Sequence, residues 1–191
     1  MIRCILNVLA ILALLAFNSY AADLNGKKIP NLESTIMNNE TVLKYESYDL
    51  GTISGSLDVK FTAMVITDPI KSNVVAAGMK VTIIADKNTA SSVYLDADEV
   101  KGLSEALTLI KSISEKYATE KKEPYTEVMF SSKGDFKFGY INKGAGAGMF
   151  ESGSSLFFRT PALESILKDD DKRFGIVQST IANALFKISN K

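Results

Sequence analysis

Carboxylates, lysines and hydroxyls are the side chains through which this sequence could do chemistry. Histidine is absent, and cysteine occurs once, as Cys4. A Ser-His-Asp triad is therefore excluded, and removal of the leader described below also excludes thiol nucleophiles and zinc sites with Cys or His ligands. An enzyme would have to work with carboxylates, Lys, Ser, Thr or Tyr, as two-carboxylate glycosidases do. The composition favours binding over catalysis.

Two clusters of acids offer oxygen ligands of the kind that calcium prefers. One contains Asp96, Asp98 and Glu99, and the other is the run at 169–171. Neither cluster has the glycine-centred spacing and distal glutamate of an EF-hand loop. Acids near a helix N-terminus are favoured by the helix dipole, which explains the first cluster more simply. The second is interpreted as a solvated break between helical segments.

Two short motifs suggest enzymes but lack their partner motifs. Ser165 and Lys168 match the S-x-x-K pattern of penicillin-binding enzymes, yet S-D-N and K-T-G are missing. The glycine-rich run at 143–148 begins with Lys143, whereas a P-loop needs Lys followed by Ser or Thr after its last glycine. We interpret the first motif as chance and the second as a flexible connection between strands.

Five aromatic residues in strand-like segments could line an apolar ligand pocket. They are Tyr45, Tyr48, Tyr94, Phe157 and Phe158. Aromatic side chains on strands more often belong to the core. Two strand-rich blocks facing helices can nevertheless enclose a cleft, so both interpretations stay open.

Residues 1–21 have the three parts of a cleavable signal peptide. Arg3 supplies the positive charge, and residues 5–17 form an apolar run interrupted only by Asn7. The small residue Ala21 favours cleavage directly after it, with cleavage one residue later as the alternative. The apolar run of 13 residues is shorter than the roughly 20 needed to cross a bilayer. We expect an exported protein, periplasmic or secreted, without a membrane span after cleavage.

The expected mature chain is close to neutral. Removing 21 of 191 residues leaves 170, and losing Arg3 leaves 21 basic against 22 acidic residues, a net charge of −1. Proteins that bind nucleic acid usually carry a clear positive charge, so the composition argues against this class. A hydrophobic share of 46% is sufficient for an ordinary core.

The domain organisation is predicted from the change in periodicity along the chain. Residues 22–40 are polar and are expected to form a linker or N-terminal arm. Residues 41–191 are expected to form a single domain of two pseudo-repeats, about 41–122 and 123–191.

In the first pseudo-repeat, alternating residues predict strands at 57–65, 79–85 and 92–95. An apolar stripe then predicts a long helix that begins after Asp96 and ends before Pro124. Asp96 is expected to cap this helix and Glu99 to complete a capping box.

In the second pseudo-repeat, strands are predicted around 128–130, 136–140, 149–151 and 155–159. Thr160 and Pro161 are expected to open a helix, because proline is well tolerated at the first helical position. An apolar stripe continues as far as Leu185, and the acids at 169–171 indicate that two helices are an alternative to one.

The predicted fold class is α+β, with an antiparallel sheet built from two repeated strand-rich halves. Each half is closed by a helix, and the helices pack on one face. The order of about four strands and a helix, given twice, resembles the PUR-repeat and Whirly class of modules. Residues 92–110, SVYLDADEVKGLSEALTLI, resemble the passage from last strand to helix in a PUR repeat. The resemblance implies this fold and single-stranded nucleic-acid binding, and no binding residues are transferred from it.

The leading functional hypothesis is an exported, non-enzymatic binding or interaction domain, whose ligand is a protein partner or a small apolar molecule. One alternative is a carboxylate-dependent hydrolase of an envelope or extracellular polymer, which requires two acids about 5 to 9.5 Å apart in a groove. The other is a single-stranded nucleic-acid binder of PUR-like build, which requires a contiguous basic face. No catalytic, cofactor-binding or metal-binding residue is predicted, and the oligomeric state stays open.

Overall fold

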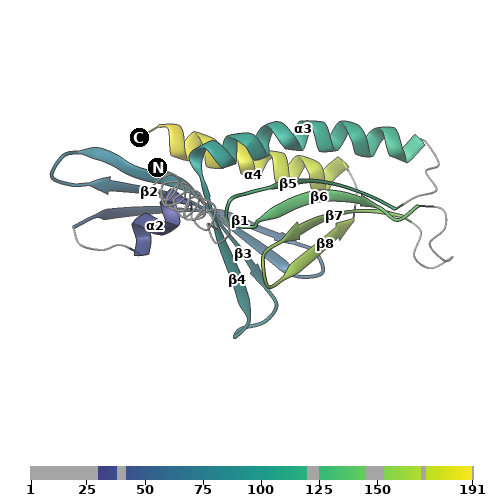
Figure 1. The fold of residues 1–191 in the computed structure, drawn as a ribbon, viewed down its shortest axis with the longest axis horizontal. Helices are drawn as coiled ribbons and strands as arrows, with labels where there is room; N and C mark the ends of the chain where they lie inside the picture. The colour runs from purple at the N-terminus through teal and green to yellow at the C-terminus, as the bar shows by residue number, and fades with distance from the viewer. Residues whose placement is uncertain (1–29, 38–41, 120–124, 145–152, 169–170, 191) are drawn as a thin grey trace, which may run out of the picture.

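The computed structural model describes residues 30–37, 42–119, 125–144, 153–168 and 171–190 (Figure 1). Its first half contains α2 (Asn31–Met37), β1 (Lys44–Ser54), β2 (Asp58–Asp68), β3 (Asn73–Ile84), β4 (Ala90–Asp96) and α3 (Ala97–Thr119). Its second half contains β5 (Thr126–Ser131), β6 (Lys137–Asn142), β7 (Ser154–Arg159), β8 (Glu164–Lys168) and α4 (Asp171–Ser189).

Each half of the chain builds its own antiparallel sheet. The strand orders are β1-β2-β3-β4 and β5-β6-β7-β8, so every strand pairs with its neighbour in sequence. A helix follows each sheet, and the protein is therefore an α+β fold of two strand-rich halves, as the sequence predicts. The strand predicted at 149–151 lies outside the described residues.

The main core lies between the two sheets and the helices α3 and α4, which run side by side along one side of the molecule (Figure 1). Phe158 of β7 lies at the centre of this core. Its ring centroid is 5.5 Å from that of Phe61 in β2 and 4.9 Å from that of Phe138 in β6. The Phe61–Phe158 contact is edge-on and joins one sheet to the other, so the two sheets share one core rather than forming separate domains.

Equivalent hairpin turns connect the two halves reciprocally. In the β1–β2 turn, the Ser56 N–H donates to the Ile166 carbonyl at 2.8 Å, and the Ile166 N–H donates to Ser56 Oγ at 2.9 Å. In the β5–β6 turn, the Lys133 N–H donates to Glu99 Oε1 at 2.6 Å. The first hairpin of each half thus contacts the last strand, or the helix start after it, of the other half. This exchange explains why the repeats form one unit.

The prediction that a helix begins at Thr160 is wrong. Residues 164–168 form strand β8, and the second helix begins only at Asp171. Thr160 closes the β7–β8 turn, because its Oγ1 accepts from the Leu163 N–H at 3.1 Å and its own N–H donates to the Leu163 carbonyl at 2.8 Å. Ser165 and Leu167 are buried while the residues between and after them are not, which is the period of a strand.

The segment 22–40, expected to be a linker or arm, contains the helix α2. Its residue Leu32 is fully buried against Ile66 and Ala76, in a second hydrophobic cluster. Ala63 of β2 belongs to the main core, whereas its neighbour Met64 packs against the second cluster. Because neighbouring strand residues point to opposite faces, α2 packs on the face of the first sheet opposite to α3 and α4. Residues 31–37 are therefore part of the domain.

Candidate functional site

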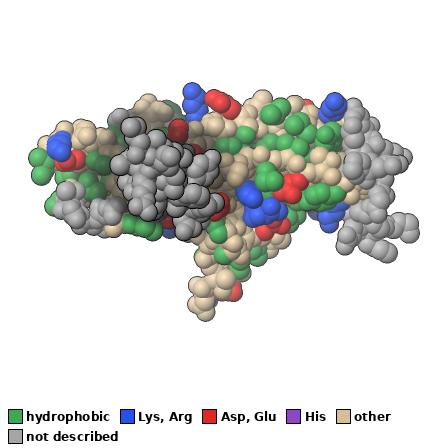
Figure 2. All heavy atoms as spheres, in the orientation of Figure 1, with side chains coloured by type: hydrophobic (Ala, Val, Ile, Leu, Met, Phe, Trp, Pro, Cys, Tyr) green, Lys and Arg blue, Asp and Glu red, His purple; other side chains and the backbone are tan. Residues whose placement is uncertain are grey.

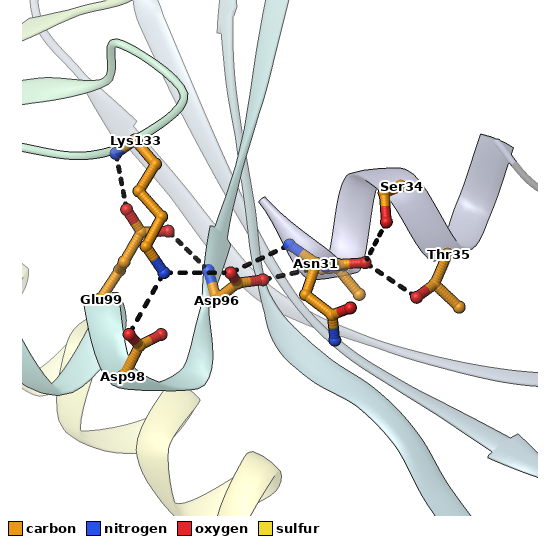
Figure 3. Close-up of polar contacts among 8 residues, drawn as sticks. Asn31, Ser34, Thr35, Asp96, Asp98, Glu99 and Lys133 are labelled. Atoms are coloured by element: carbon orange, nitrogen blue, oxygen red, sulfur yellow. Dashed lines mark hydrogen bonds and ion pairs between the residues drawn. The ribbon is translucent and has the colours of Figure 1, made fainter. Parts of the chain in front are cut away.

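The acids at the start of α3 form a structural network (Figure 3). The Asp96 carboxylate accepts from the backbone N–H groups of Asn31 and Leu32, each at 2.9 Å. The Asp96 N–H donates to Glu99 Oε2 at 3.0 Å, so the glutamate arm of the expected capping box is present. The aspartate arm caps a different helix, α2, which sequence spacing alone did not indicate.

Lys133 connects this network to the second half of the chain. Its Nζ lies 3.3 Å from Asp96 Oδ2 and 3.2 Å from Asp98 Oδ2 (Figure 3). The hydrogen bond to Asp98 is the main reason why the pKa of Lys133 is raised, and the bond to Asp96 adds to it. The oxygens that calcium would need are therefore directed at an ammonium group and at backbone N–H groups, and they do not converge on an empty centre.

Ser165 and Lys168, the S-x-x-K pair, do not form a dyad. The Ser165 hydroxyl is buried and donates to the Leu57 carbonyl at 2.6 Å, while its oxygen accepts from the Leu57 N–H at 3.2 Å. Lys168 is exposed at the end of β8. An odd spacing along a strand places two side chains on opposite faces. Ser165 therefore stabilises the contact between the β1–β2 turn and β8.

The five aromatic residues do not share a pocket. Phe158 belongs to the core, and Phe157 is buried on the other face of its sheet, with the Arg159 guanidinium carbon 4.7 Å from its ring centroid. Tyr94 packs against the α2 cluster, Tyr48 lies against the edge of the main core, and Tyr45 is exposed on β1. None of them lines either cleft described below.

Two glutamates converge on Arg159 on the outer face of the second sheet. Glu164 accepts from Arg159 Nε, and Glu127 Oε1 lies 3.2 Å from Arg159 Nη1. Arg159 thus forms an ion pair with each of the two carboxylates. This cluster is a salt-bridge network.

The glycine-rich run and the second acidic cluster fall mostly outside the described residues. Only Lys143 and Gly144 of the first are described, and the Lys143 N–H donates to the Gly153 carbonyl at 3.1 Å. Of the acids at 169–171, Asp171 is the first residue of α4. Within the described segments, no three His, Cys, Asp or Glu side chains are grouped so that they could ligate a metal ion.

A cleft of about 550 Å³ lies between α2 and the end of the β2–β3 hairpin. The residues that line it are Ser34, Thr35, Leu43, Asp68, Lys71, Asn73, Val74 and Val75. Ser34 and Thr35 belong to α2, and their hydroxyls donate to the Asn31 carbonyl at 3.3 and 2.8 Å. One wall of the cleft is thus the helix that Asp96 caps.

A β-bulge determines the opposite wall. Ile66 pairs with Ala76 and Thr67 with Val74, so Val75 is an extra residue without a partner on β2. Neighbouring residues of a regular strand point to opposite faces, but a bulge re-aims them. Both Val74 and Val75 therefore line the cleft, and about two-fifths of each is exposed.

Asp68 stabilises the β2–β3 hairpin turn beside the cleft. Its Oδ1 accepts from the N–H groups of Ile70 and Lys71 at 2.9 and 3.1 Å. These two bonds, first that from Lys71, hold the pKa of Asp68 below its usual value, and the Lys71 ammonium adds to the effect. Ser72 has a φ of 54°, which residues other than glycine rarely adopt. The turn presents Ile70, which is 88% exposed, at the rim.

The region around this cleft has a concentration of exposed apolar side chains. Met37 at the end of α2 and Val42 before β1 are 66% and 76% exposed, and Ile70, Val74 and Val75 lie on the hairpin. A second cleft, of about 360 Å³, lies between β1 and α4 and is lined mainly by hydroxyl and basic side chains. Exposed apolar groups beside a cleft are typical of interaction sites, which singles out the first cleft.

Comparison with protein families, with curated proteins and with solved structures finds no match for this chain. The resemblance to the PUR-repeat and Whirly class is neither supported nor refuted by it. Among the described helices, none has the length and apolar character to cross a membrane.

The sequence did not indicate the cleft, for two reasons. The α2 segment is short and mostly polar, and it becomes a wall only through Asp96, 64 residues away from Leu32. The bulge at Val75 interrupts an alternation that would otherwise place only one of the two valines there. The one available signal was the pair of adjacent valines beside a turn that begins with Asp68 and Pro69.

Proposed function

We propose that this chain is an exported, non-enzymatic binding domain whose protein partner binds at the cleft between α2 and the β2–β3 hairpin. The observation that carries the proposal is the group of exposed apolar residues around this cleft, Met37, Val42, Ile70, Val74 and Val75. The leader expected at residues 1–21 supports export.

A protein partner suits the cleft better than a small apolar ligand. Sites for small apolar ligands bury most of the ligand within predominantly apolar walls. Here the lining combines valine and leucine with Ser34, Thr35 and Asn73, and the most exposed apolar residues, Met37, Val42 and Ile70, are not among the lining residues. The pattern of apolar and polar side chains is that of a protein interface.

The charge arrangement gives little support to nucleic-acid binding. On the face shown in Figure 2, the Lys and Arg side chains lie singly or beside acids. Lys60 is 2.9 Å from Asp49, and Lys44 is 3.4 Å from Glu46. Binding to a phosphate backbone would need several such cations directed at it together. A salt-sensitive affinity for single strands would nevertheless restore this alternative.

Photo-crosslinking in the host tests the proposal. A photoreactive residue replaces Val75, and a second variant carries it at Leu109, an exposed apolar residue of α3 that is far along the chain from the cleft. We expect one protein to be crosslinked from position 75 and not from 109, and to be lost when Ile70→Asp is added. Equal crosslinking from both positions, or none from 75, would count against the cleft.

A further inference from the structure

Strand β5 is an edge of the second sheet, and its free side has the regular geometry for adding a strand. All six residues of β5 pair with β6 without a register shift. The Ser132 N–H donates to the Phe136 carbonyl at 2.9 Å. Because these directions alternate along a strand, the N–H and C=O groups of Glu127, Met129 and Ser131 point away from β6. Within the described segments, these groups have no hydrogen bond to another element.

The usual protections of an edge strand are missing from β5. Natural edges are often protected by lysine, proline or a bulge. This strand contains no lysine or proline, and its pairing has no bulge. Its one charge, on Glu127, is directed to Arg159 at 3.2 Å. The other edge of the same sheet, β8, is occupied instead, because its Ile166 carbonyl accepts from the β1–β2 turn.

The sequence of β5 pairs well with itself in one antiparallel register. If a two-fold axis perpendicular to the sheet relates two copies, opposite residues lie on the same face, so the axis passes beside a residue. An axis at Met129 places Val128 of each copy opposite Phe130 of the other, which are favourable pairs of a β-branched and an aromatic residue. Glu127 then lies opposite Ser131, so no like charges meet. Met129, which is 43% exposed, contacts its own copy.

Helix α3 would pair with its own copy about the same axis. The Lys133 N–H donates to Glu99, and a Cβ on Gly102 would lie 3.5 Å from the Phe130 ring, so α3 runs antiparallel along β5. Met129 is four strand residues, about 13 Å, from Lys133. In a helix the same distance takes about nine residues, which leads from Glu99 to the middle of α3. Two copies of the helix would therefore overlap along their whole length.

The flank of α3 beside β5 has the spacing of a helix–helix contact. Gly102, Ala106, Leu109 and Ile113 follow one another at steps of four, three and four residues, the periodicity of a coiled-coil seam, and Leu109 is 60% exposed. Since α3 contacts both β5 and β6, its axis lies about half a strand spacing inside β5, and the two-fold lies half a spacing outside it. The two helix axes would be separated by two strand spacings, roughly 10 Å, the distance of packed helices.

We propose that two copies of this chain associate through β5 and α3, with the two-fold axis at Met129. Two four-stranded sheets then join into one of eight strands, flanked by an antiparallel pair of α3 helices. The occupant of the edge is a second copy, because the strand register and the helix overlap place the axis at the same residue independently. This dimer is a property beyond partner binding at the cleft, which lies on the first sheet.

Sedimentation equilibrium of the purified full chain tests the interface. Wild type should be a dimer. Met129→Arg sets two like charges opposite each other at the axis and should raise the dissociation constant at least about tenfold. Ile176→Arg makes the same change at a residue of α4 with a similar exposure, 41%, and should remain dimeric. A monomeric wild type, an unchanged dissociation constant for Met129→Arg, or an equal weakening by Ile176→Arg would overturn the proposal.

Photo-crosslinking of the purified full chain gives a second readout that leaves β5 unchanged. A photoreactive residue at Leu109 should give a covalent dimer of this chain, and the product should be lost when Met129→Arg is added. A photoreactive residue at Phe186 of α4, which is 62% exposed, should give none. The mass of two copies distinguishes this product from the partner crosslinked from Val75 in the host. No dimer from Leu109, or as much from Phe186, would contradict the proposal.

Discussion

The Asp96 carboxylate, at the end of β4, accepts a hydrogen bond of 2.9 Å from the backbone N–H of Leu32, 64 residues earlier in the chain. This bond positions α2, whose Ser34 and Thr35 form one wall of the cleft. Lys133, from the second half, approaches the same carboxylate at 3.3 Å. The cleft therefore depends on contacts among three segments that lie far apart in sequence.

Asp96→Ala should destabilise the fold, because it leaves the N–H groups of Asn31 and Leu32 without their acceptor. We expect a loss of about 1–3 kcal/mol in the free energy of unfolding, measured by urea denaturation. Asp98→Ala is the matched control. Its side chain is 73% exposed and it contacts the same lysine, so its loss should be within about 0.5 kcal/mol. Equal losses would contradict the capping role of Asp96.

Gly78→Ala should be strongly destabilising. A Cβ at this position of β3 would overlap the Leu95 carbonyl oxygen and lie 3.1 Å from Leu32 Cδ2. Since one of these atoms is backbone, we expect a loss of about 3 kcal/mol or more in thermal denaturation. Gly175→Ala, in α4, would meet no atom within 4 Å and should stabilise the protein by about 0.5–1 kcal/mol. A tolerated Gly78→Ala would show that the sheet and α2 are packed less closely.

Ser165→Ala should lower the stability of the fold without abolishing any catalytic activity. It removes a buried hydroxyl that bonds both the N–H and the carbonyl of Leu57, at a cost of about 1–2 kcal/mol. Lys168→Ala should change the stability by less than about 0.5 kcal/mol. The wild-type chain should not be acylated by a fluorescent penicillin. Labelling that disappears in Ser165→Ala would instead establish a nucleophilic serine.

The contribution of Asp68 to the stability of the turn beside the cleft should be lost in acid. Because its pKa is lowered in the folded state, Asp68 contributes stability above its ordinary pKa of 3.8 and loses this contribution as the pH falls through the folded value. Asp68→Asn keeps an acceptor oxygen but removes the charge. The difference in unfolding free energy between wild type and Asp68→Asn should therefore be present at neutral pH and shrink below 3.8. A difference that stays constant with pH would contradict this role.

The parts of the fold with a regular period could be predicted from the sequence. Alternation predicted β2, β3 and β4, and the apolar stripe after Asp96 predicted α3. The prediction failed at residues 160–168, where Leu163, Ile166 and Leu167 have helical spacing while Ser165, a polar residue, faces the interior. Burial of Ser165 depends on the β1–β2 turn, more than 100 residues away. Local periodicity contains no information about such a partner.

The candidate site was less predictable than the fold. The acids around Asp96 predict the helix start at Ala97, yet the helix that Asp96 caps is α2 rather than α3. The hydrogen-bond partner of a side chain is set by tertiary packing, whereas its preference for a helix end is local. Similarly, Val74 and Val75 line one cleft only because a bulge changes the register of β3.

The most direct test of the central claim is the affinity of the crosslinked partner, once purified, for three versions of this chain. Wild type, Val75→Asp and Leu109→Asp would be compared by isothermal titration calorimetry. We predict that Val75→Asp weakens binding at least about tenfold, because a charge enters the apolar contact, while Leu109→Asp leaves the affinity unchanged. Unchanged binding by Val75→Asp, or an equal loss in both variants, would show that the partner does not bind at the cleft between α2 and the β2–β3 hairpin.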